Sequence, residues 1–78
     1  MDKQTINLYK LAIEKTIGTG ETMNYIKRIC ERKFNLKSDI VEKVINLMIE
    51  KNEAKIIIEQ GGDGWNSSYE YEEIALTK

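Results

Sequence analysis

Residues 24–51, NYIKRICERKFNLKSDIVEKVINLMIEK, carry most of the information about how this chain of 78 residues folds. In the first half, apolar side chains recur every three or four positions, which places them on one side of a helix. They are Met23, just ahead of the stretch, Ile26, Cys30 and Phe34, with Tyr25 and Ile29 beside them. The second half has a broader apolar stripe of Ile40, Val41, Val44, Ile45, Leu47, Met48 and Ile49. The stretch therefore predicts two amphipathic helices.

Polar residues mark where these two helices begin and where the chain turns between them. Asn24 and Ser38 are residue types that cap helix N-termini, and we predict that they do so here. Asn35 is an asparagine, which after glycine is the residue that most readily adopts the left-handed conformation of a tight turn. Asp39 and Glu42 are favourable near the positive end of a helix dipole. We expect a helix, a short turn over residues 35–37 and a second helix.

The composition indicates one small domain, residues 1–78, with a thin core that a homodimer or another partner would complete. Cys30 is the single cysteine, so it forms no internal disulfide, and its place on an apolar helix side predicts a buried thiol in a reducing compartment. The chain has no apolar run of membrane-spanning length, and its start, MDKQ, is unlike a secretory signal. We expect a soluble, cytoplasmic protein without membrane contact.

The flanking segments predict one more helix and a small sheet. Residues 5–17 carry apolar side chains at helical spacing, namely Ile6, Tyr9, Ile13 and Ile17, with Leu8, Leu11 and Ala12 widening the stripe. Gly18 and Gly20 should end this helix, and residues 22–23 are candidates for a brief strand. Residues 53–60, with three consecutive isoleucines, and residues 67–77 predict two strands around the turn 61–64, GGDG. The alternation in the last strand changes phase, which predicts a bulge near Glu73.

This order of elements resembles the winged helix-turn-helix superfamily over nearly the whole chain. The residues that carry the resemblance are Cys30, Phe34, Leu36, Val41 and Val44, which fall at the apolar intervals around the turn. Asn35 takes the place of the usual turn glycine, LMIEKNEAKII is similar to the exit into the first wing strand, and YEEIALTK is similar to the second wing strand. Glu31 departs from the pattern, because a small residue is usual there. The resemblance implies a mainly α fold with a small antiparallel sheet.

The same resemblance implies that the helix of residues 38–51 enters the major groove of DNA. Ser38, Lys43 and Asn46 would then point toward base edges, but Asp39, Glu42 and Glu50 share that exposed side. Between Glu59 and Glu73 the expected wing contains five acidic residues and neither lysine nor arginine. Carboxylates near phosphates weaken binding, so this half of the chain is unfavourable for a polyanion.

Charge is divided along the chain. Residues 1–37 contain eight Lys or Arg and four acids, whereas residues 38–78 contain four Lys and nine acids. The positive charge concentrates at Lys27, Arg28, Arg32, Lys33 and Lys37. These side chains are candidates for phosphate contacts, for an acidic protein, or for the acidic half of a second copy. They are also consistent with the solvated face of an ordinary helix.

Two hypotheses follow. The first is a small DNA-binding protein, a transcriptional regulator that acts as a dimer, using the five basic residues together with Ser38, Lys43 and Asn46. The second is a protein-interaction module, such as an adaptor, a subunit or an inhibitor of a nucleic-acid-handling machine. Its contact residues would be Asp39, Glu42, Glu50, Trp65, Glu70 and Glu72. The chain has no histidine to activate Cys30, so we expect neither an enzyme nor a metal site, and no cofactor.

Overall fold

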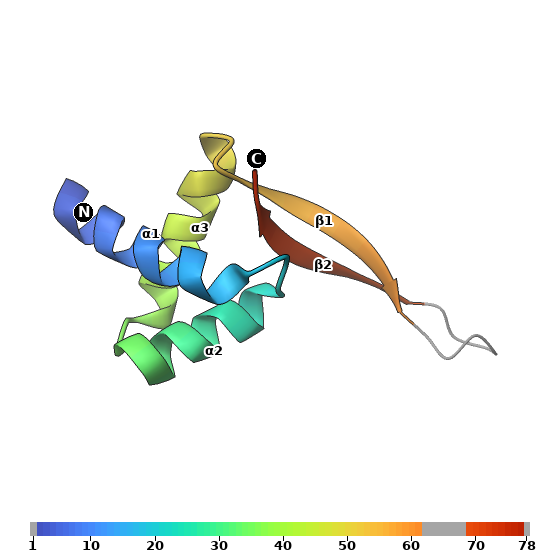
Figure 1. Ribbon diagram of the computed structural model, residues 1–78, viewed down its shortest axis with the longest axis horizontal. Coiled ribbons are helices and arrows are strands. Elements are labelled where there is room, and N and C mark those ends of the chain that lie inside the picture. Colours follow the sequence, from blue (N-terminus) through green and yellow to red (C-terminus); the bar gives the residue numbers. More distant parts are fainter. Residues whose placement is uncertain (1, 62–68, 78) are drawn as a thin grey trace.

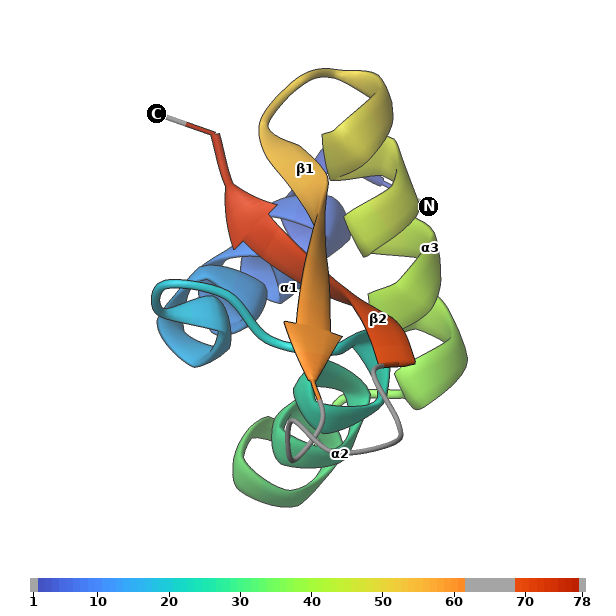
Figure 2. The ribbon, with the colours of Figure 1, turned by 90° about the vertical axis from the view of Figure 1, so that its right-hand side faces the viewer.

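The computed structural model describes residues 2–61 and 69–77 (Figure 1). Within these residues the chain forms three helices followed by two antiparallel strands. The elements are α1 (Lys3–Ile17), α2 (Met23–Phe34), α3 (Ser38–Glu50), β1 (Ala54–Gly61) and β2 (Tyr69–Leu76). The helices gather into one group, and the two strands form a ribbon that projects away from them (Figures 1 and 2). The expected mainly helical fold with a small antiparallel sheet is confirmed.

The core lies where the three helices meet the base of the ribbon. Its largest fully buried side chains include Ile13 of α1, Ile26 of α2 and Ile45 of α3, and the ribbon contributes Ala54 and Ile74. The remaining buried members are Tyr9, Ala12, Ile17, Cys30, Leu36, Val41, Val44 and Met48. The helical spacing of the apolar residues thus identified most of the core, and Cys30 is buried as predicted.

Both predicted caps of the central helices were assigned to the wrong residue. Helix α2 begins after Thr22, whose hydroxyl accepts a hydrogen bond from the Tyr25 N–H at 3.2 Å, so Asn24 lies inside the helix. Helix α3 begins after Lys37, which makes no side-chain capping bond, so Ser38 is already helical. The Lys37 carbonyl instead accepts from the N–H groups of Ile40 and Val41. The apolar pattern located the helices but did not fix their first turns.

The ribbon corrects two further expectations. Its register is continuous from Ala54 opposite Leu76 to Gly61 opposite Tyr69, so no bulge occurs near Glu73. The change of phase instead reflects which face is covered: Ile74 packs in the core, whereas Tyr71 lies on the opposite face farther along the ribbon. The strand expected at residues 22–23 is replaced by a single bridge one residue earlier, between Glu21 and Ile74.

Several large apolar side chains stay exposed in the described part of the chain. Leu8 and Leu11, which were predicted to widen the buried stripe of α1, are 58% and 57% exposed. The others are Tyr25, Phe34, Ile56, Ile58 and Tyr71. These residues therefore form surface rather than core. None of the three described helices has both the length and the apolar character of a membrane-spanning segment.

Candidate nucleic-acid interface

The centre of the candidate interface is the turn that joins α2 to α3. Asn35 adopts the predicted left-handed conformation, with φ 56° and ψ 40°. Its N–H and that of Leu36 both donate to the Cys30 carbonyl, the second at 3.2 Å, which closes the end of α2. The buried Leu36 side chain then fixes the turn to the core. This arrangement sets the angle at which α3 leaves the turn.

A contact from α1 holds the same turn in place. The hydroxyl of Tyr9 accepts a hydrogen bond from the Lys37 N–H at 3.2 Å, immediately before α3 begins. Tyr9 is buried, so its ring belongs to the core while its oxygen reaches the backbone of the turn. Sequence reasoning placed Tyr9 on the apolar side of α1 but missed this role, because the contact spans 28 residues of sequence.

The five predicted phosphate-binding residues do not form one surface. Arg28 and Arg32 are four residues apart and exposed, so they lie on one outward side of α2. Lys33 lies toward α1 instead, in a hollow of about 280 Å³ that it shares with Lys15 and Phe34. Lys37 lines a shallow hollow of about 490 Å³ at the turn with Glu31, Asn35, Leu36, Ser38 and Asp39. Of the five, Arg28, Arg32, Lys33 and Lys37 are exposed, but only Arg28 and Arg32 share one side of α2.

Lys27, the fifth of these residues, forms an ion pair within the molecule. Its ammonium group lies 2.9 Å from Oε1 of Glu42, which joins α2 to α3. A second ion pair, from Lys10 to Glu53 at 2.8 Å, joins α1 to the segment after α3. Both pairs connect the basic half of the sequence to the acidic half within one molecule. Part of the predicted attraction between the two halves is thus satisfied internally.

The exposed side of α3 is less acidic than the sequence indicated, because Glu42 is neutralised by Lys27. The outward residues are Asp39, Lys43, Asn46 and Glu50, which are exposed and spaced three or four positions apart. Their formal charges sum to minus one. Ser38 is half-buried at the start of the helix. Lys43 and Asn46 are therefore the donors on this stripe that an outside molecule can reach most directly.

The ribbon offers a different surface beside α3. Ile56 and Ile58 are 48% and 60% exposed, on the same strand face whose base packs in the core. A hollow of about 300 Å³ lies at the foot of this face, lined by Thr22, Met23, Asn24, Asn46, Ile49, Ile56, Glu72 and Ile74. Glu70 and Glu72 are exposed on β2. Trp65 and the GGDG turn beyond Gly61 lie outside the described residues.

The Cys30 thiol has no feature of a reactive group. Burial raises its pKa above the ordinary value of 9.0, an effect that the nearby Thr16 hydroxyl, 3.8 Å from the sulfur, partly offsets. A raised pKa keeps the thiol protonated at neutral pH, and a protonated thiol is a poor nucleophile. No cluster of three or more potential metal-ligating side chains occurs in the part of the chain that the structure describes.

The arrangement can therefore present a short helix beside exposed cations, with an apolar and acidic ribbon next to it. Asn24, Ile49 and Ile56, which the sequence did not place in any candidate site, line the hollow between them. Their spacing along the chain gives no signal of this meeting, because it depends on how the ribbon leaves α3. Comparisons of the chain with protein families, with curated proteins and with solved structures found no match.

Proposed function

We propose that this chain is a small DNA-binding protein of the winged helix-turn-helix class, with the role of a transcriptional regulator. The observation that carries the proposal is the position of Arg28, Arg32 and Lys37. All three are exposed, and neither of the two ion pairs among the described residues involves them. Lys37 lies in the turn from which α3 projects, and Arg28 and Arg32 precede that turn on α2. Phosphate contacts at these positions would direct α3 toward a groove.

Each exposed donor has a chemical role under this proposal. Arg28 and Arg32 on α2 and Lys37 in the turn contact phosphates and provide the binding energy that does not depend on base sequence. Lys43 suits the acceptor atoms of guanine, and Asn46 suits the paired donor and acceptor of adenine. Asp39 and Glu50 on the same stripe disfavour nearby phosphates, so they restrict how α3 can approach. Lys27 and Lys33 have lesser roles, since Lys27 is paired and Lys33 lies toward α1.

A titration with mixed-sequence duplex DNA at low and near-physiological salt tests the proposal, with a gel shift and the single tryptophan of the chain as reporters. We expect binding that weakens steeply with salt. The double variant Arg28→Gln, Arg32→Gln should lower the affinity about tenfold or more and reduce the salt slope by about two. The control Lys33→Gln, Lys51→Gln removes the same charge from elsewhere and should change affinity much less.

Absence of binding at low salt, or equal losses in the two double variants, would contradict the proposal. A second candidate function would then take its place, namely a protein-interaction module. The exposed Ile56 and Ile58 favour it, because adjacent apolar side chains next to Glu72 suit a partner with apolar and basic groups. In that case Ile58→Lys together with Glu72→Lys should release the partner, whereas Arg28→Gln, Arg32→Gln should not.

A further inference from the structure

Helix α1 has two apolar sides, and only one of them belongs to the core. Its inner side supplies four buried residues, Tyr9, Ala12, Ile13 and Ile17. Its outer side carries the exposed residues Gln4, Leu8, Leu11 and Lys15 at steps of four, three and four, with exposed Lys3, Asn7 and Glu14 on one flank of this row. Steps of this kind keep side chains in line along a helix, as in a seam between two helices. Two leucines stand in the middle of this outer side.

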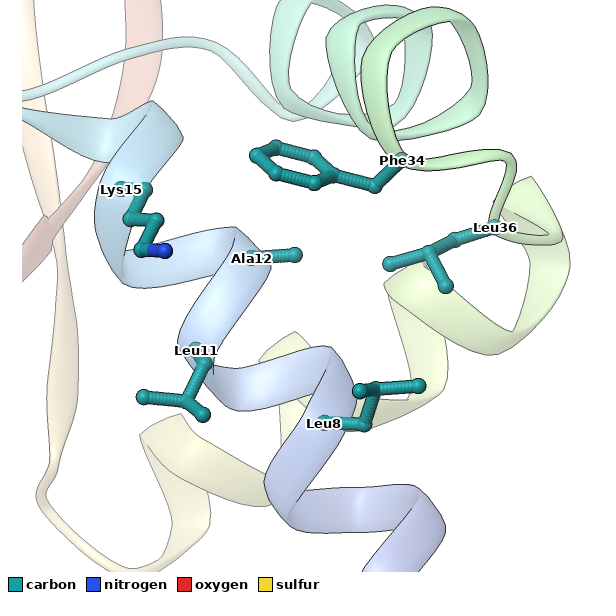
Figure 3. A pocket seen from close by; sticks show the side chains of 6 residues that line it. All are labelled: Leu8, Leu11, Ala12, Lys15, Phe34 and Leu36. Carbon is teal, nitrogen blue, oxygen red and sulfur yellow. The ribbon is translucent and has the colours of Figure 1, made fainter.

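The two leucines border a hollow of about 200 Å³ (Figure 3). Ala12 and Lys15 of α1 line it on one side, and Phe34 and Leu36 line it on the other. Figure 3 shows Phe34 and Leu36 directed toward α1 across this space. Leu8 and Leu11 are more than half exposed, and Phe34 is 38% exposed. Water therefore contacts three apolar side chains around this hollow, Leu8, Leu11 and Phe34, which we call the α1 patch.

We propose that the α1 patch binds a second copy of this chain, with the two α1 helices antiparallel about a twofold axis. In this arrangement Leu8 lies against the partner's Leu11, and Leu11 lies against the partner's Leu8. Phe34 covers the edge of the paired helices on each side. A twofold interface needs one self-complementary surface. A short row of apolar side chains that the axis pairs with its own copy on the partner meets that requirement.

The charges on either side of the seam also fit this partner. Lys3 and Glu14 are eleven residues apart, which is about three helical turns, so they lie on the same flank of α1 at opposite ends. Antiparallel pairing about the centre of the leucines places Lys3 two positions, about 3 Å, from the level of the partner's Glu14, and Glu14 equally close to the level of the partner's Lys3. Neither residue takes part in the ion pairs found among the described residues. Parallel pairing about a twofold axis would instead set this flank against the other flank of the partner, so Lys3 and Glu14 would not meet.

The location of the α1 patch leaves the proposed DNA surface free. Its hollow is lined by α1 and by the end of α2 and the turn, and no residue of α3 or of the ribbon lines it. A dimer through α1 therefore supplies two copies of α3 without covering either. The inference adds the dimer contact to the proposed function but does not rest on it, because the seam and its charges are independent of DNA.

Sedimentation equilibrium of the full chain without DNA tests the dimer, over concentrations from about 1 µM to about 1 mM. We expect a reversible dimer. The variant Leu8→Lys should raise the dissociation constant at least about tenfold, because it places charge in an apolar seam. The control Ile58→Lys changes an isoleucine of similar exposure, 60% against 58%, and should leave the dissociation constant unchanged. A wild-type monomer throughout, or a Leu8→Lys dimer as strong as wild type, overturns the proposal.

Charge reversal tests the antiparallel arrangement itself. Lys3→Glu and Glu14→Lys should each weaken the dimer, and the double variant should return to within about threefold of wild type. Both single changes place charges of the sign that the helix dipole favours, so neither should unfold α1. A double variant no stronger than the single variants overturns the arrangement. Because no nucleic acid is present, these results are distinct from success or failure of the DNA proposal.

Discussion

The ammonium group of Lys27 on α2 donates a hydrogen bond to Oε1 of Glu42 on α3 at 2.9 Å. This pair removes one positive charge from the basic side of α2 and one negative charge from the exposed side of α3. The variant Glu42→Gln should therefore strengthen DNA binding, because it releases Lys27 as well as removing a carboxylate. We expect about a threefold to tenfold gain at low salt and a salt slope that is steeper by about one. A DNA titration at several salt concentrations measures both.

A double-mutant cycle shows whether the gain comes from Lys27. In the background Lys27→Gln, the change Glu42→Gln should still remove repulsion but should no longer steepen the salt slope. An equal change of slope in both backgrounds would mean that Lys27 does not contact phosphate when it is released.

The Lys37 N–H donates a hydrogen bond to the Tyr9 hydroxyl, so removing that hydroxyl should lower the stability of the fold. Tyr9→Phe keeps the buried ring but leaves this N–H without its partner, so the free energy of unfolding should fall by about 1 kcal/mol. Urea unfolding followed by circular dichroism measures the change. Tyr25→Phe, at a residue that is 43% exposed, is the matched control and should have little effect. Equal stability of the wild type and Tyr9→Phe would show that the bond contributes nothing to the fold.

The left-handed conformation of Asn35 predicts different effects on stability for two small substitutions. Asn35→Gly should leave stability unchanged within about 0.5 kcal/mol, since glycine adopts φ 56° without strain. Asn35→Ala should cost about 1 kcal/mol, because a Cβ without a polar side chain is unfavourable in this conformation. Thermal unfolding of the two variants in parallel tests this order. A glycine variant less stable than the alanine variant would contradict it.

The sequence was most informative where local chemistry determines local structure. Helical spacing identified Ile13, Ile26 and Ile45 as core, and the preference of asparagine for left-handed backbone located the turn at Asn35. The exposure of Leu8 and Leu11 was not foreseeable in this way. On a helix with two apolar sides, spacing alone does not say which side faces the core, because that depends on where α2 and α3 pack.

The placement of the candidate site residues depends on tertiary packing, which the sequence pattern does not give. Membership in a basic cluster along the sequence suggested that Lys27, Lys33 and Arg28 act together, but successive helix positions point in different directions. Lys27 consequently meets Glu42, Lys33 lines an open hollow beside α1, and Arg28 lies on a different, exposed side of α2. The tertiary structure determines which acidic side chain lies beside a given basic side chain. The composition of the two halves indicated only that both kinds of side chain were present.

The cap of α1 predicts a specific pH dependence. The Asp2 carboxylate accepts a hydrogen bond from the Thr5 N–H at 2.7 Å, and hydrogen bonds from the Thr5 side chain and backbone hold the pKa of Asp2 below its ordinary value of 3.8. Because the folded-state pKa is the lower one, the stabilisation is present above pH 3.8 and is lost as the pH falls through the lowered pKa. Asp2→Asn keeps a capping acceptor that does not titrate. The difference in Tm between the wild type and Asp2→Asn should therefore decline on acidification, while the shared titration of other carboxylates cancels. A difference that stays constant from neutral to strongly acidic pH would show that the charge on Asp2 does not stabilise the helix.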